Sequence, residues 1–122
     1  MLIRHLTGDP PEMAARARKA LAGADELLLA DLIVAECVYV LESFYEVPRE
    51  RVAELMRAAI ALPTIKTLDA ASLLRALEVY EVDLLDFAEA YLVAQAEATG
   101  VAAILSFDKV IDRVKTVTRH EP

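Results

Sequence analysis

One helix followed by one strand, with an acidic residue at each end, constrains this chain more than any other stretch. Asp86 begins an apolar helical segment that stops at Gly100, and an apolar run over residues 101–106 leads directly to Asp108. Glycine stops helices readily because it adopts the left-handed conformation without a Cβ penalty. Since a helix and the strand after it run out and back, we expect Asp86 and Asp108 to return to the same edge of a sheet. Two acids at one sheet edge are the beginning of a divalent-metal site.

Length and composition limit the class of protein. The 122 residues are the size of one domain, and 57% hydrophobic residues are enough for a buried core. The net charge of −7 excludes a broadly basic nucleic-acid binder, so contact with nucleic acid would need a local basic patch or a bound cation. The single Cys37 excludes an internal disulfide and fits either a reducing cytoplasm or simply a buried thiol; no signal-peptide pattern precedes it, and we expect a cytoplasmic location. The most apolar window, residues 27–41, contains Asp31 and Glu36 and is too short to span a bilayer.

Helical segments alternate with short apolar runs along the chain. Start signals followed by apolar residues at helical spacing predict helices over residues 10–22, 31–45, 48–62, 70–80 and 86–99, with a helical turn over 108–113. Short apolar runs predict strands over residues 26–30, 63–68, 101–106 and 114–118. Isolated strands between helices indicate a parallel α/β sheet in a single domain, residues 1–122. Residues 1–8 are too short and too polar for the strand that normally opens such a sheet.

Two helices carry further predictions about packing. The apolar stripe of the helix over 31–45 is expected to contain Ile33, Val34, Cys37, Val38, Leu41 and Phe44. The helix over 48–62 has an apolar face that fits either the core or a dimer contact, formed by Val52, Met56 and Ile60. Three acids at helix starts are interpreted as N-caps: Asp9, Asp31 and Asp69.

Four acids map to the carboxyl ends of the expected strands, where open parallel sheets bind their ligands. They are Glu36, Asp86, Glu89 and Asp108. Converging carboxylates repel one another unless a proton or a cation lies between them. Ligands that are all oxygen select hard ions such as Mg²⁺ or Mn²⁺, and these ions activate water for attack on a phosphodiester. Asp83 and Asp112 are either supporting acids near this site or solvated surface residues.

Each of these acids also has a purely structural interpretation. Asp86 and Glu89 fit an Asp-x-x-Glu capping box, which is the commoner explanation of that pair taken alone. Asp108 fits a turn or cap equally well. Glu36 lies at the margin of an apolar stripe, so we expect it to be half-buried and to need a partner. A salt bridge to Arg4 is the structural alternative for Glu36.

Four segments, in order and spacing over nearly the whole chain, resemble one known family. They are residues 2–17, 34–41, 86–94 and 105–109. Together they resemble the PIN-domain ribonucleases, and among these the VapC-type toxins of toxin–antitoxin pairs. The resemblance implies a Rossmann-like three-layer α/β/α sandwich with a parallel sheet, and an acidic quartet that binds Mg²⁺ or Mn²⁺. It also implies RNA as substrate, a homodimer, and an antitoxin partner that plugs the groove.

The family's acids carry over by position. The second acid is Glu36, the fourth is Asp108, and the third is Glu89 by register, with Asp86 one turn earlier as the alternative. The family's first acid ends an opening strand, Asp-Thr-Asn-Val-Leu-Ile-Arg, whose Val corresponds to Met1. We therefore expect a late start that removes a central strand and one carboxylate. Its loss would lower stability and metal affinity and expose apolar surface on the strands over 26–30 and 101–105.

Basic residues near the expected site are candidates for RNA binding. The candidates are Arg4, Arg16, Lys109 and Arg113, with Arg18, Lys19, Lys115 and Arg119 as further members of the same two clusters. The structural alternative is that each of these basic residues is simply a solvated surface residue. A competing function is a PIN-like binding module without catalysis, which predicts no metal-dependent cleavage. A receiver-type phospho-acceptor domain is excluded because the required paired acids and strand-ending Lys are absent from the sequence.

Overall fold

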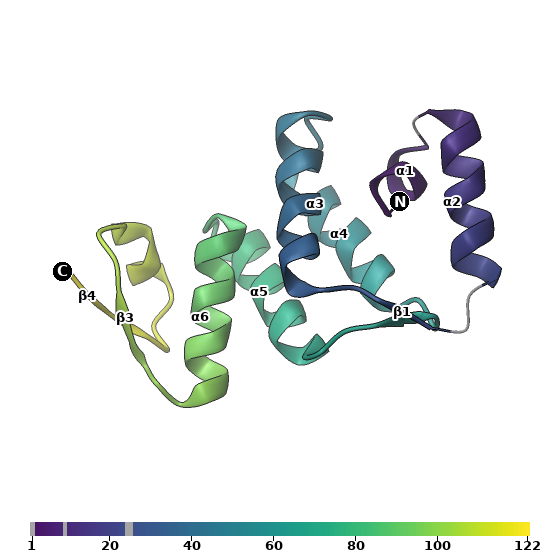
Figure 1. The fold of residues 1–122 in the computed structure, drawn as a ribbon. Helices are drawn as coiled ribbons and strands as arrows, with labels where there is room; N and C mark the ends of the chain where they lie inside the picture. Colours follow the sequence, from purple (N-terminus) through teal and green to yellow (C-terminus); the bar gives the residue numbers. More distant parts are fainter. Residues whose placement is uncertain (1, 9, 24–25) are drawn as a thin grey trace. The chain divides into compact units, whose positions relative to one another are not determined.

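The computed structural model describes residues 2–8, 10–23 and 26–122, which form two compact units, residues 1–68 and residues 69–122 (Figure 1). The elements of the first unit are α1 (Leu2–Thr7), α2 (Pro11–Gly23), β1 (Leu27–Leu28), α3 (Asp31–Ser43), α4 (Arg49–Ile60) and β2 (Ile65–Lys66). Those of the second unit are α5 (Ala70–Val82), α6 (Phe87–Thr99), β3 (Ala103–Leu105), the 3₁₀ helix η1 (Lys109–Arg113) and β4 (Thr118–His120). The predicted single domain over residues 1–122 stays a prediction.

In the first unit, β1 and β2 form a parallel pair. Leu27 lies opposite Ile65, and the Leu27 amide donates to the carbonyl of Thr64 at 2.7 Å. Helices α3 and α4 contact each other, and both contribute fully buried side chains to the core, among them Leu41 and Met56. The face formed by Val52, Met56 and Ile60 is therefore core, and its interpretation as a dimer contact is wrong.

The second unit places a helical hairpin beside a second parallel pair. Helices α5 and α6 pack closely along their length through fully buried side chains that include Leu77 and Val93 (Figure 1). Strand β3 lies parallel to β4, with Ala103 opposite Thr118. Helix α6 ends at Gly100, whose φ of 74° is the left-handed conformation expected for a glycine stop. The turn at Gly100 sends the chain back along β3 toward Asp108.

The predicted α/β class with parallel strands is confirmed, and so are all five predicted helices to within a few residues. The described strands form two parallel pairs rather than one sheet, and none of them precedes β1. Residues 2–7, which the pattern left unassigned, form helix α1. Leu28 and Leu105 are 71% and 68% exposed, as expected for strands that lack a neighbour. None of the described helices combines the length and apolar character needed to cross a membrane.

The last strand was predicted over residues 114–118, and this placement is wrong. The amide of Val114 donates to the carbonyl of Ile111 at 3.0 Å, so Val114 ends η1 and is buried beneath it. Pairing with β3 begins only where the Thr118 amide reaches the carbonyl of Ala102 at 2.8 Å. The apolar run over residues 114–118 therefore reflects the burial of Val114 at the end of η1, and the strand begins only at Thr118.

The predicted N-cap is confirmed at Asp69 and wrong at Asp31. Asp69 caps α5, with its carboxylate accepting from the Ser72 amide at 3.0 Å, as predicted. The N-cap of α3 is Ala30 rather than Asp31, which is the first helical residue, and Asp9 lies outside the described residues. Ile33 and Phe44 are exposed because the core stripe of α3 contains only Val34, Cys37, Val38 and Leu41.

Replacing Gly100 by Ala should lower the free energy of unfolding by about 1 kcal/mol, because an L-residue is strained at positive φ. No atom outside Gly100 and its two chain neighbours lies within 4 Å of the position a Cβ would take, so the cost is conformational rather than steric. Gly23→Ala is the matched control, since Gly23 has no positive φ and equally open surroundings. Its stability should stay equal or rise by up to about 1 kcal/mol. Equal losses in urea unfolding of both variants would contradict this account of the helix end.

Candidate functional site

The first turn of α6 fixes the positions of two predicted site residues, Asp86 and Glu89. Asp86 is the N-cap, and its Oδ1 accepts a hydrogen bond from the Glu89 amide at 2.8 Å. Leu85 and Phe87 on either side of the cap are buried, so the start of the helix is anchored in the core. The capping interpretation of Asp86 is confirmed, and it holds Glu89 one turn into the helix.

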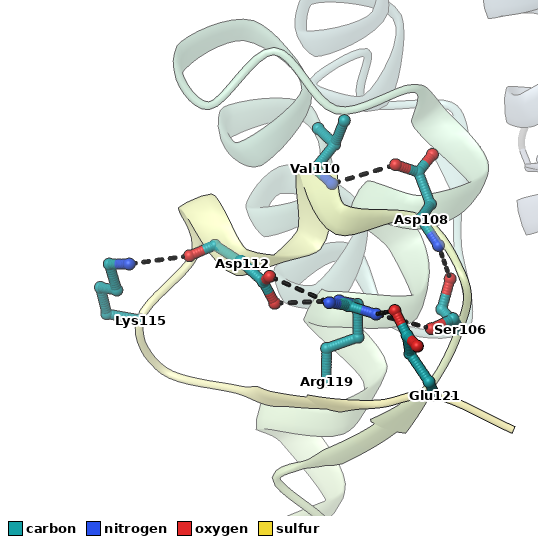
Figure 2. Close-up of polar contacts among 7 residues, drawn as sticks. All are labelled: Ser106, Asp108, Val110, Asp112, Lys115, Arg119 and Glu121. Carbon is teal, nitrogen blue, oxygen red and sulfur yellow. Dashed lines mark hydrogen bonds and ion pairs between the residues drawn. The ribbon is translucent and has the colours of Figure 1, made fainter.

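Asp108 follows β3 on a short turn that it helps to form itself. Its amide donates to the hydroxyl of Ser106 at 3.0 Å, and its Oδ1 accepts from the amide of Val110 at 3.0 Å (Figure 2). The second bond caps η1, whose Ile111 is fully buried. Asp108 is thus a structural cap as well as an exposed carboxylate at the end of a strand.

Glu89 and Asp108 are hydrogen-bonded through their side chains. The pKa of Glu89 is raised to about 7, first by burial, then by the hydrogen bond with Asp108, and then by the charges of Asp86 and Asp108. The pKa of Asp108 is lowered, first by the Val110 amide and then by the same hydrogen bond. Below about pH 7 the proton therefore resides on Glu89, which donates to the Asp108 carboxylate. The structure places Glu89 beside Asp108 and within range of the charge of Asp86.

The chemistry of this pair fits a hard divalent cation. Two carboxylates that share a proton are oxygen ligands held in one place, and a cation can replace the proton between them. Among the described residues, however, no group of three or more His, Cys, Asp or Glu side chains is arranged to hold a metal. Glu89 and Asp108 are therefore the candidate ligands in this unit, and Asp86 adds its negative charge to Glu89 and caps α6.

Glu36 lies on α3 in the first unit and is exposed, whereas the sequence predicted a half-buried residue. The physical reason is the narrow core stripe of α3, which leaves the positions of Leu32, Glu36 and Tyr39 exposed on the helix. The proposed salt bridge from Glu36 to Arg4 falls on a side chain outside the described part of the chain.

The candidate RNA-binding residues fall on both units. Arg16 is exposed on α2 of the first unit, and nothing is described of the Arg4 side chain. Lys109 and Arg113 are exposed on η1, directly after Asp108. Arg113 donates to the carbonyl of Asp83 at 3.3 Å, and its positive charge helps to lower the pKa of Asp108. Two of the four candidates therefore lie beside the carboxylate pair.

Arg119 and Asp112 have a role that the sequence did not reveal. The Arg119 side chain is only 11% exposed and forms a two-pronged ion pair with Asp112, at 3.0 Å from Nε and 3.2 Å from Nη2 (Figure 2). Arg119 is one of the RNA-binding candidates, and its guanidinium is engaged in ion pairs inside the unit; its contact with RNA stays a prediction. No local pattern links residues seven apart across a turn, so only the register of β4 could have disclosed the pair.

Comparison with known proteins places the chain in a family. A family model of the PIN domain matches residues 1–117, so the chain belongs to the PIN-domain family. PIN domains are generally nucleases and generally use divalent metal ions. No curated protein and no solved structure matches the chain.

Because Glu89 holds its proton to about pH 7, its carboxyl carbon should titrate with a midpoint near 7 in a ¹³C NMR experiment on the metal-free protein. Asp108→Asn should lower this midpoint toward the ordinary value of 4.5, since a neighbouring negative charge and a carboxylate acceptor are lost. A raised folded-state pKa stabilises the fold fully below about pH 4.5, and this contribution disappears as the pH rises through about 7.

Glu97 is the internal control for this titration, because its pKa is lowered by hydrogen bonds from Arg75 and Thr116. Its midpoint should not respond to the Asp108 substitution. A Glu89 midpoint at or below 4.5 would contradict the shared proton.

Proposed function

We propose that the chain is a metal-dependent endoribonuclease in which Glu89 and Asp108 bind Mg²⁺ or Mn²⁺. The proposal rests on one observation, the hydrogen-bonded carboxyl–carboxylate pair beside Asp86 in a chain of the PIN-domain family. The sequence resemblance adds Glu36 as a further proposed ligand, by its family position. The family resemblance supports RNA as the nucleic acid.

In this proposal, residues of the second unit have separate roles in cleaving the phosphodiester. A bound divalent ion supplies Lewis acidity, which activates water and stabilises the departing oxygen of a phosphodiester. Glu89 would release its proton to solvent when the ion binds, which frees a ligand oxygen, and Asp108, with its lowered pKa, would bind as the carboxylate. Lys109 and Arg113 contribute positive charge next to the pair, where an RNA phosphate would otherwise be repelled by the carboxylates.

The resemblance to VapC-type toxins supports three finer proposals. The chain would act in the cytoplasm as the toxin of a toxin–antitoxin pair, its protein partner would be an antitoxin that covers the groove, and it would form a homodimer. The face of α4 formed by Val52, Met56 and Ile60 is not available for that dimer because it is buried.

A binding module without catalysis is the second candidate function. One observation favours it: the described residues contain no group of three or more side chains able to hold a metal. Such a module would keep its protein partner after Glu89→Gln and would cleave nothing.

A mixed structured RNA should be cut in Mn²⁺ and left intact in chelator, because the chelator removes the ion that would activate water in this proposal. Asp108→Asn and Glu89→Gln should each lower the cleavage rate about 100-fold or more. Gel analysis of end-labelled RNA with single-turnover kinetics measures both effects.

Glu54→Gln is the matched control for these variants. It removes one exposed acid that pairs with Arg51 on α4, and its cleavage rate should equal that of the unaltered chain. Equal rates for Asp108→Asn and Glu54→Gln would show a contaminating nuclease. No cleavage in any metal would leave the binding module as the better account.

A further inference from the structure

Arg119 joins the two ends of the segment that contains Asp108. At one end its Nη1 donates to the backbone carbonyl of Ser106 at 3.2 Å, and at the other its Nε and Nη2 grip the carboxylate of Asp112 (Figure 2). Glu121 accepts a further bond from Nη1 at 3.0 Å. Asp108 lies between the two anchored ends, two residues after Ser106 and four before Asp112.

The segment between these anchors depends on short-range bonds. The Asp108 amide is held by the Ser106 hydroxyl, and the Asp108 carboxylate is held by the Val110 amide. Ser106 itself is tied to β4 through its amide, which donates to the carbonyl of His120 at 3.0 Å. The position of the Asp108 carboxylate therefore depends on how well Ser106 and Asp112 are kept in place.

We propose that Arg119 is a positioning residue, which holds the turn from Ser106 to Asp112 so that the Asp108 carboxylate faces Glu89. The inference rests on the proposed function, since facing Glu89 matters only if the pair binds a cation. A guanidinium suits this role because it is planar and presents several N–H groups in a fixed fork. A Lys ammonium would keep the charge and could not bond to both oxygens of Asp112 and to the Ser106 carbonyl in that geometry.

Two substitutions distinguish positioning by the Arg119 side chain from a simple effect of its positive charge. Arg119 contributes positive charge toward Asp108, and Arg113 contributes more. Arg119→Lys preserves that charge while removing the fork, so any change in the variant reports on the position of the turn. Asp112→Asn tests the same bond from the other side.

Amide hydrogen exchange followed by NMR on the full, metal-free chain is the first readout. In Arg119→Lys the Val110 amide, which reports the Asp108 cap, should exchange about tenfold faster. The Ser72 amide, which makes the equivalent bond to Asp69 in the same unit at 3.0 Å, should not change. Asp112→Asn should reproduce the effect, and the double variant should be no worse than either single one because the two residues act as one pair.

Mn²⁺ affinity measured by calorimetry is the second readout. It should weaken about tenfold in Arg119→Lys, as for other residues that orient a metal ligand. Arg51→Lys is the matched control: Arg51 is 54% exposed, pairs with Glu54 on α4, and should show neither effect.

The two readouts separate failure of this inference from failure of the proposed function. Unchanged Val110 exchange in Arg119→Lys, or equal acceleration of Val110 and Ser72, overturns the positioning role. Faster Val110 exchange with unchanged Mn²⁺ affinity also overturns it, because Arg119 would then be merely structural. If Val110 responds but neither the unaltered chain nor Asp108→Asn binds Mn²⁺, the nuclease proposal fails and the role of Arg119 is limited to holding the turn.

Discussion

The hydrogen bond between Glu89 and Asp108 is the interaction on which the proposed chemistry depends. It connects the first turn of α6 to the residue that follows β3, two points that are 19 positions apart in the chain. Three negative groups would repel one another there, and the raised pKa of Glu89 relieves that repulsion by keeping one proton in the cluster. Glu89 and Asp108 are thus held side by side at the place where the proposed divalent ion would bind.

The rest of the second unit keeps this pair together. The cap by Asp86 and the buried Leu85 and Phe87 fix where α6 begins, and the left-handed Gly100 turns the chain back along β3. Pairing with β4 brings Arg119 under the turn that contains Asp108. These surrounding residues therefore fix the positions of Glu89 and Asp108.

Sequence reasoning predicted those parts that depend on local signals. Helix starts such as Asp69 and Asp86, and the stop at Gly100, follow from capping chemistry, and all three were predicted correctly. The acids brought together at the start of α6 and after β3 follow from the helix–strand geometry. Predictions failed where the outcome depended on distant packing. Val114 is apolar and is buried at the end of η1, and the sequence predicted a strand there instead. The ion pair of Arg119 with Asp112 could be known only from the register of β4. Glu36 was misjudged because hydrophobic neighbours in sequence did not bury that face of α3.

The measurement that tests the account most directly is the number of protons released when Mn²⁺ binds, obtained by calorimetry in two buffers of different ionisation heat. If a cation replaces the proton shared by Glu89 and Asp108, about one proton per Mn²⁺ should leave at pH near 6, and release should approach zero well above the Glu89 pKa of about 7. Glu89→Gln should abolish this release. Binding without proton release near pH 6, or release that persists in Glu89→Gln, would contradict the claim that this pair is the metal site.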